Sequence, residues 1–409
     1  MYGAKNPSCL LIKIQINPLL IEHYDLIRDT VVAILEELNS GTLRKVHIPV
    51  QEILLYQQNK INSLFQNLAP KSNIIDCGVC YGNPIEISTL EQSLVTVLNN
   101  RKEGIGIMGV IGTNATMKKP LYDIETVSVS VPALTFSDYV QIVRGKKIPD
   151  RLRLQIYNAL IESNNPREVL TKLQLLKPNI RSQWAGLHNQ SIANYFQYVP
   201  QGISSFEKAI FQIIPPLVSV EHASVLIIPK LVAILAKSPA LSGYELASQL
   251  QCNRATIREL LQALSNSGIC NSLPPVSIDR EPLSSSSKKP YLQLFSLPGL
   301  RAIIAKSAHI SQELYQQYVP LDALGAMLHT TISQETSMYS EGLHGILIKK
   351  KNNETILFSC SSTDTISALA ARIKKRNAQI GFFVTEKSEL KIHPLDKIIQ
   401  LPMQYCYLL

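Results

Sequence analysis

A segment in the second half of the chain carries side chains suited to contact nucleic acid. Between Arg254 and Leu264, apolar residues recur at helical spacing, namely Ile257, Leu260, Leu261 and Leu264. The outward face of such a helix carries Arg254, Thr256, Arg258, Glu259 and Gln262. Guanidinium, hydroxyl and amide groups on a helix can reach phosphates and base edges in a major groove. The segment therefore permits duplex DNA binding, and it equally fits an ordinary solvated face.

A second candidate for chemistry is the CxxC pair formed by Cys77 and Cys80. Such a pair can be a redox dithiol or half of a zinc site. A zinc site needs a second pair, and Cys252 and Cys270 are too far apart in sequence to form one. We therefore interpret these cysteines as structural. The total of seven, scattered without a repeating spacing, favours a reducing compartment.

Three predicted helices would position the outward face described above. Apolar residues recur at helical spacing between Ile227 and Leu235, which predicts the first helix. Ser242 and Glu245 form a capping box that starts the second helix. Asn253 is placed to cap the third helix, and Gly268 is placed to end it in a left-handed conformation.

Two predicted strands and a polar hairpin complete this unit. Residues 269–273 and 291–297 have strand-like patterns. Residues 274–289 between them are polar and include a run of serines. The resulting order is helix, helix, helix, strand, wing, strand. That order is typical of a winged helix, a module that docks on DNA or on other proteins.

Length and composition bound the rest of the chain. Its 409 residues, 45% of them hydrophobic, are enough for about three domains of ~150 residues each. The formal net charge is +9, but only 17% of residues are charged and the basic ones are dispersed, so charge alone argues weakly for an anionic partner. The most apolar region, residues 213–236, is interrupted by Glu221, His222 and Lys230. We expect a cytoplasmic protein with no membrane partner.

Alternating strand-like and helical runs predict an α/β layer in the first half of the chain. The predicted strands are 46–50, 73–75 ending at Asp76, and 105–111, and the predicted helices are 26–38, 53–68 and 90–99. After Pro132 the pattern becomes helical, and Asn165 with Pro166 marks a helix start. The predicted order strand, strand, helix, strand follows over 346–350, 355–359, 365–376 and 380–385. The predicted parts are 1–145, 146–222, 223–305 and 306–409.

Several motifs occur in one order along the chain. They are IMGVIGTNAT (107–116), VPALTFSDY (131–139), ELASQL, TIRELLQAL, GICNSLPP, LFSLPGLR, GILIKK, TILFSCSS and QIGFFVT. In order and spacing they resemble the prokaryotic AAA-type ATP-binding proteins, and only the first seventy or so residues match poorly. The resemblance implies an AAA-type P-loop-like α/β core, a helical region, a winged helix and a small restriction-endonuclease-like α/β domain, with ATP and Mg²⁺ as ligands.

The phosphate-binding loop implied by this resemblance is degenerate. The nearest stretch is YGAKNPSCLL, where Gly3 and Lys5 lie near the start and Ser8 stands at the magnesium-contacting position. The later glycine and the lysine before the hydroxyl residue are missing. Pro7 stands about where that lysine would be, and proline lacks the amide donor that such a loop uses.

The second implied motif is also incomplete. In NIIDCG, Asp76 stands at the metal-placing position, and Cys77 stands where a carboxylate would orient the attacking water. Thr113 and Asn114 complete the implied nucleotide-binding set. These departures favour a pseudo-ATPase that binds ATP and Mg²⁺ without hydrolysis. The alternative is an active ATPase, coupled to DNA or to a protein partner, in which Asp76 places magnesium and Lys5 serves the phosphates.

The implied nuclease-like domain lacks the expected carboxylates. Phosphodiester hydrolysis needs a bound metal and a positioned water, which related domains hold with acidic residues on two neighbouring strands. The matching strands here carry His344, Phe358 and Cys360, while Glu341 and Glu354 are expected in a loop and a turn. We therefore expect no nuclease activity. The leading hypothesis is a binding or regulatory protein, and a third reading is a winged-helix DNA-binding regulator.

Overall fold

The structure is a computed structural model that divides into two compact units. The first comprises residues 1–133 with 200–202 and 266–268, and the second comprises 134–199, 203–265 and 269–409. The predicted helices 26–38, 53–68 and 90–99, the strand 46–50 and the tip of the wing lie outside the described residues. The described residues are 9–16, 74–81, 105–113, 125–131, 133–146, 148–199, 227–266, 268–276, 289–331, 337–350, 352–386, 389–393 and 397–409.

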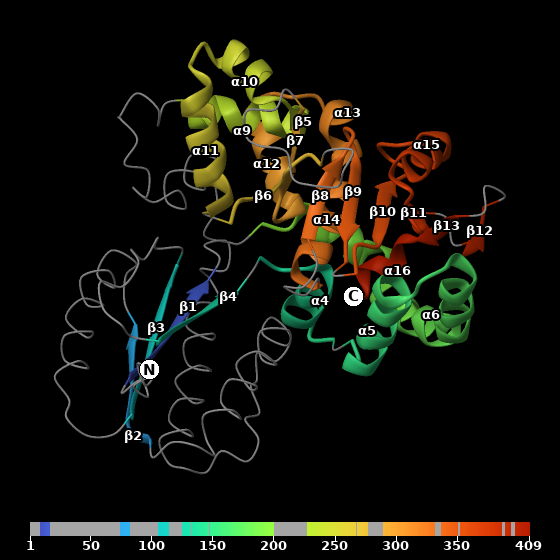
Figure 1. The fold of residues 1–409 in the computed structure, drawn as a ribbon, viewed down its shortest axis with the longest axis horizontal. Coiled ribbons are helices and arrows are strands. Elements are labelled where there is room, and N and C mark those ends of the chain that lie inside the picture. The colour runs from blue at the N-terminus through green and yellow to red at the C-terminus, as the bar shows by residue number, and fades with distance from the viewer. Residues whose placement is uncertain are drawn as a thin grey trace, which may run out of the picture. The chain divides into compact units, whose positions relative to one another are not determined.

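A parallel sheet forms the described part of the first unit (Figure 1). Its strands are β1 (Cys9–Ile16), β2 (Ile74–Tyr81), β3 (Ile105–Thr113) and β4 (Glu125–Val131). They lie in the order β2-β3-β1-β4, with every neighbouring pair parallel. Aliphatic runs such as CLLIKIQI are typical of strands in parallel sheets. The prediction that the second strand ends at Asp76 is wrong, because β2 continues to Tyr81.

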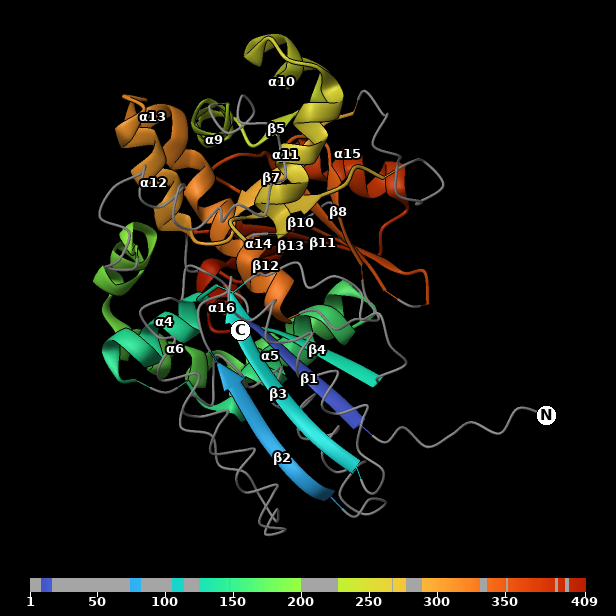
Figure 2. The ribbon, with the colours of Figure 1, turned by 90° about the vertical axis from the view of Figure 1, so that its left-hand side faces the viewer.

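Three helices and a small antiparallel sheet open the second half of the second unit (Figure 2). They are α9 (Ile228–Lys237), β5 (Ala240–Leu241), α10 (Gly243–Leu250), α11 (Arg254–Asn266), β6 (Cys270–Leu273) and β7 (Tyr291–Phe295). The sheet order is β5-β7-β6. The predicted order of helices and strands is therefore present, and the two-residue strand β5 is an addition that the sequence pattern did not reveal.

The predicted helix caps in this region are confirmed. The Ser242 hydroxyl accepts from the Glu245 amide at 3.2 Å, and the Glu245 carboxylate accepts from the Ser242 amide at 2.7 Å. The side chain of Asn253 accepts from the Thr256 amide at 2.8 Å. Gly268 has a φ of +72°, the left-handed conformation that favours glycine. These local interactions fix where α10 and α11 begin.

A six-stranded mixed sheet forms the C-terminal part of the second unit. Its strands are β8 (Ser337–Glu341), β9 (Gly345–Lys349), β10 (Thr355–Cys360), β11 (Ile380–Thr385), β12 (Lys391–Ile392) and β13 (Ile398–Pro402), in the order β12-β13-β11-β10-β9-β8. Strands β10, β11 and β13 are parallel. Helix α15 (Ile366–Arg376) connects β10 to β11, and its Leu369 and Ile373 pack with Leu357 on one face of the sheet. The predicted strand, strand, helix, strand order is confirmed.

Further helices complete the second unit. They are α4 (Phe136–Arg144), α5 (Asp150–Tyr157), the π-helix η2 (Asn158–Glu162), α6 (Pro166–Gln197), α12 (Pro298–Ser307), α13 (Gln312–Tyr315), the 3₁₀ helix η3 (Gln316–Tyr318), α14 (Val319–Thr331) and α16 (Met403–Tyr407). Asn165 caps α6 as predicted, because its side chain accepts from the Glu168 amide. Within the described ranges, none of the helices combines the length and the hydropathy needed to span a bilayer. The protein is of mixed α/β class.

The motif VPALTFSDY has a structural role in this unit. The Thr135 hydroxyl donates to the Asp138 carboxylate at 2.6 Å, which caps the start of α4. Phe136 is fully buried, with its ring centroid 5.5 Å from that of Tyr195 on α6 and 6.0 Å from that of Tyr407 on α16. The motif therefore joins α4 to α6 and to the C-terminal helix.

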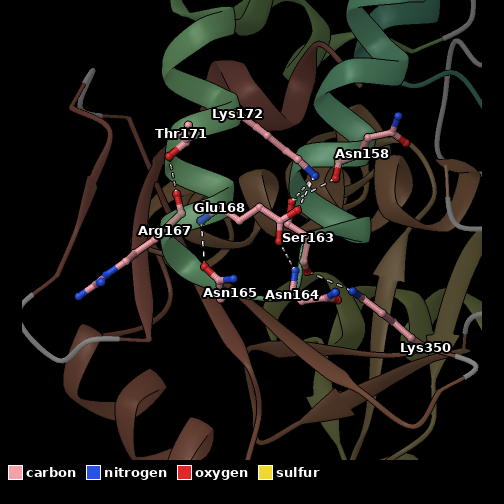
Figure 3. A network of polar contacts seen from close by, with 9 residues as sticks. All are labelled: Asn158, Ser163, Asn164, Asn165, Arg167, Glu168, Thr171, Lys172 and Lys350. Carbon is pink, nitrogen blue, oxygen red and sulfur yellow. Dashed lines mark hydrogen bonds and ion pairs between the residues drawn. The ribbon is translucent and has the colours of Figure 1, made fainter.

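A polar corner links β9 to the start of α6 (Figure 3). The Lys350 ammonium, just after β9, donates to the Ser163 carbonyl at 3.2 Å. Lys172 donates to the Ser163 hydroxyl at 3.1 Å and pairs with Glu168 at 2.7 Å. Ser163 is fully buried, and the two lysines supply hydrogen bonds to its hydroxyl and carbonyl groups.

A buried ion pair joins the three-helix region to α14. The Arg301 guanidinium on α12 makes two hydrogen bonds to the Asp322 carboxylate, at 2.5 and 2.8 Å. It also donates to the carbonyls of Leu235 and Ala236 near the end of α9. Asp322 in turn accepts from the Phe295 amide of β7 at 3.0 Å. Both side chains are fully buried and hydrogen-bonded, so four elements meet at one charged pair.

Candidate functional site

The outward face of α11 is a candidate nucleic-acid interface. Ile257, Leu260 and Leu264 are buried against the rest of the unit, as predicted. This leaves Arg254, Arg258 and Gln262 exposed at intervals of four residues. Residues four apart lie about 6 Å apart along a helix and on one side of it. The three predicted contact residues therefore form one polar stripe.

The two arginines of this stripe are available for an outside partner. Neither the Arg254 nor the Arg258 side chain forms a hydrogen bond or an ion pair with the described residues. Thr256 differs, because it is half-buried and its hydroxyl donates to the Asn253 side chain at 3.1 Å. The Thr256 hydroxyl thus contributes to the cap of α11, whereas the sequence pattern placed it among the outward contact residues.

An exposed aromatic residue lies on the preceding helix. Tyr244 on α10 is 65% exposed, which is unusual for a large ring with an apolar face. Sequence reasoning missed it, because its exposure depends on which side of α10 faces the core. The available signal was its place in the amphipathic pattern, opposite the inward Leu246.

The strand register separates the predicted nucleotide-binding residues. Cys9, which follows Ser8 in the chain, pairs with Gly106 at the start of β3, and Asp76 also pairs with Gly106. Thr113 lies at the other end of β3, opposite Ile16. Seven residues of strand correspond to roughly 23 Å. Asp76 therefore lies toward the amino ends of the strands, and Thr113 lies at the carboxyl end of β3. Gly3, Lys5, Ser8 and Asn114 lie outside the described residues.

The local order around β1 also differs from that of a phosphate-binding loop. In P-loop proteins a strand precedes the glycine-rich loop, and a helix follows it. Here the stretch with Gly3, Lys5 and Ser8 leads directly into β1, whose first residues, Cys9 to Leu11, belong to the same motif. Ligands of parallel α/β sheets bind at the carboxyl ends of the strands. The stretch precedes the amino end of β1 instead.

The acidic residues considered for a nuclease site are engaged in structural contacts. Glu341 was expected in a loop, which is wrong, because it is the last residue of β8. Its buried carboxylate accepts from Arg376 of α15 at 2.6 Å. Hydrogen bonding to Gln379 lowers the pKa of Glu354. Among the described residues, no group of three His, Cys, Asp or Glu side chains is placed to hold a metal ion.

The matching strand positions carry packing residues. Phe358 of β10 stacks on Phe382 of β11, with 4.7 Å between ring centroids. Cys360 is buried, which raises the pKa of its thiol well above the ordinary value. Partial burial lowers the pKa of His344, which lies at the turn between β8 and β9. None of these three groups is an anionic ligand at neutral pH.

The predicted cysteine pair lies within one strand. Cys77 and Cys80 both belong to β2. Cys252, Cys270, Cys360 and Cys406 are free thiols in the described part of the chain. No protein-family model matches this chain, and no curated protein matches it significantly.

Proposed function

We propose that this chain acts by binding, as a degenerate AAA-type module in which nucleotide is at most a regulatory ligand. The observation that carries the proposal is the strand register, in which Asp76 and Thr113 lie toward opposite ends of the parallel strands. Phosphoryl transfer depends on positioning the metal, the phosphates and the water together. A core that separates these groups is unsuited to hydrolysis. The alternative with an active ATPase requires all of them at one edge.

Thermal unfolding with and without ATP and Mg²⁺, run in parallel with a phosphate-release assay, tests this proposal. A ligand at ~100 times its Kd adds about 2.7 kcal/mol to stability. We expect a shift of the midpoint without phosphate release, and we expect Asp76→Ala to reduce the shift. Glu389→Ala, which changes an exposed carboxylate elsewhere, is the control. Release of phosphate at several turnovers per minute would instead favour the active ATPase.

The second candidate function is duplex nucleic-acid binding through α11, as a winged-helix regulator. The observation that favours it is the exposed stripe, in which Arg254 and Arg258 pair with none of the described residues. Arginine guanidinium groups contact phosphates and guanine edges, and each neutralised phosphate contributes to the salt dependence of binding. The exposed Tyr244 on α10 adds a ring that can pack on a sugar or a base. A protein partner on the same stripe remains the other option.

Duplex binding measured across a salt series separates these options. If Arg258 contacts a phosphate, Arg258→Ala makes the negative slope of log K against log salt shallower by about 0.9. The matched control is Arg167→Ala, which removes the same charge from an exposed position on α6. Absence of duplex binding at low salt would remove the nucleic-acid option and direct attention to a protein partner.

A further inference from the structure

The second unit contains a cavity of about 290 Å³ at the carboxyl ends of β10 and β11. Ser361, Ser362 and Glu386 contribute its polar side, and Val384, Met403 and Tyr407 contribute apolar walls. The Tyr407 hydroxyl donates to the Pro320 carbonyl at 3.3 Å, which fixes this buried side chain beneath the cavity. The cavity is distinct from the α11 stripe and from the parallel sheet of the first unit.

The topology around the cavity is that of a ligand site in an α/β sheet. Strands β10 and β11 are parallel neighbours joined through α15 (Figure 1). Ligands of such sheets bind outside the carboxyl ends of the strands. The Ser361 amide donates to the Val384 carbonyl at 2.8 Å, and the Asp364 amide donates to the Cys360 carbonyl at 3.0 Å. These bonds hold the hydroxyl-bearing loop after β10 in place.

The polar groups of the cavity match the hydroxyls of a sugar. The side chains of Ser361, Ser362 and Glu386 are exposed and form no hydrogen bond with the described residues. A carboxylate only accepts hydrogen bonds, through two oxygens, so it suits a pair of neighbouring hydroxyl donors. In dinucleotide-binding folds, a carboxylate about 20 residues after the first turn binds ribose in this way. Glu386 follows β11, the strand after α15, and so occupies the corresponding place.

The apolar wall completes the match. Met403 supplies a partly exposed, flexible thioether, and Val384 and Tyr407 are buried beneath it. Small-molecule sites combine such walls with a few polar groups that fix orientation. We propose that this cavity binds a ribonucleoside, with its ribose hydroxyls on Glu386 and its base against Met403. The Cys360 thiol beneath the cavity is buried and takes no part in chemistry.

Calorimetric titration of the full chain with adenosine and with 2′-deoxyadenosine tests the proposal. Adenosine should bind, and 2′-deoxyadenosine should bind about tenfold or more weakly, because hydrogen bonds to charged groups contribute at least that factor. Glu386→Gln should weaken adenosine by a similar factor. Ser361→Phe, which fills the cavity, should abolish binding. Glu389→Gln, an exposed carboxylate paired with Lys391, should leave it unchanged.

Two results with the wild type and the cavity variants would overturn the proposal. One is absence of any heat with adenosine at about 5 mM, a concentration that detects even millimolar affinity. The other is unchanged affinity in both Glu386→Gln and Ser361→Phe, with circular dichroism showing that both variants are folded. The variant Asp76→Ala distinguishes this site from the core. Loss in Asp76→Ala with retention in Glu386→Gln would place adenosine in the first unit and so contradict the cavity proposal alone.

Discussion

At the scale of single residues, the Arg301 and Asp322 pair has the largest expected effect on stability. Both side chains are fully buried, and the guanidinium also satisfies two carbonyls at the end of α9. Burying two charges is costly, and the attraction between them offsets the cost only while both are present. Removal of one partner leaves the other charge buried and unpaired. The pair therefore tolerates no single change, although its net contribution to stability is modest.

We predict that Asp322→Ala lowers the free energy of unfolding by about 3–5 kcal/mol, because it leaves Arg301 charged and unpaired. Urea unfolding followed by circular dichroism measures the effect. The matched control is Glu389→Ala, which removes an exposed carboxylate paired with Lys391 at 2.7 Å. Exposed pairs contribute about 0–1 kcal/mol. Equal effects of the two substitutions would show that the buried pair is not formed.

A second prediction at the residue scale concerns Ser242. Loss of this N-cap in Ser242→Ala should cost about 1 kcal/mol of stability at neutral pH, whereas Ser248→Ala on the exposed side of α10 should be neutral or slightly stabilising. Hydrogen bonds from the Ser242 amide and hydroxyl lower the pKa of Glu245. Because the carboxyl pKa is lower in the folded state, ionised Glu245 stabilises the fold above the ordinary pKa of 4.5. This stabilisation is lost as the pH falls through the pKa of the folded state.

The pH dependence gives this prediction its test. The difference in unfolding free energy between wild type and Ser242→Ala should narrow as the pH falls below about 4.5, where protonation of Glu245 breaks one half of the capping box. The measurement is urea unfolding of both proteins at neutral pH and at about pH 3.5. A difference that is independent of pH would show that Glu245 does not take part.

At the scale of elements, two glycines in helices should respond in opposite directions to alanine. A Cβ on Gly299 of α12 would overlap with the Tyr198 carbonyl oxygen at the end of α6. Gly299→Ala should therefore push α12 and α6 apart and lower stability by about 1–3 kcal/mol. Gly186 lies inside α6 with nothing within 4 Å of its Cβ position. Gly186→Ala should raise stability by about 0.5–1 kcal/mol.

Urea unfolding of the two variants measures this pair of effects. The same substitution in the two helices controls for helix propensity, so the difference isolates the close approach of backbone at Gly299. Destabilisation of both variants, or of neither, would contradict the contact between α12 and Tyr198.

The elements that the sequence predicts well are those fixed by neighbouring residues. Asn165, Ser242 and Asn253 cap helices through bonds to residues three positions on, so their pattern is visible in the sequence. Strand β8, SMYSE, carries little apolar signal, and it forms because β9 pairs with it in the folded sheet. Glu341 was misplaced for this reason. Strand β13, IIQLP, was also missed, because it lacks an alternating pattern and ends in proline.

The candidate sites were harder to predict than the elements. The α11 stripe follows from helical periodicity alone, and the exposed positions of Arg254 and Arg258 are as expected. The separation of Asp76 from Thr113 depends on the register of two strands that are distant in the chain, which no local pattern encodes. The Arg301 and Asp322 contact and the cavity beside Glu386 are likewise products of long-range packing.

At the scale of the whole molecule, the second unit has the contacts of an independently folding body. Its helices and sheets share buried interfaces. It contains the buried pair of Arg301 and Asp322, the ring contacts of Phe136, and the polar corner with Lys350. We predict that a fragment of residues 134–409 unfolds cooperatively in urea, with coincident transitions by circular dichroism and fluorescence. A gradual, probe-dependent transition would show that the first unit is needed for its fold.

That fragment also offers a control for the nucleoside proposal. It retains Ser361 and Glu386 and lacks Asp76. If it folds as predicted, its affinity for adenosine should equal that of the full chain. A loss of affinity in a cooperatively folded fragment would place the binding site in the first unit.

The buried pair of Arg301 and Asp322 also limits how this sequence can change over generations. A single replacement of either residue passes through a state with a lone buried charge, whereas joint replacement by apolar residues of similar volume is often neutral. Drift at the two positions, which lie 21 residues apart, is therefore coupled. Homologous chains should carry both charges or neither, and the shift from one form to the other should occur in lineages with stability to spare.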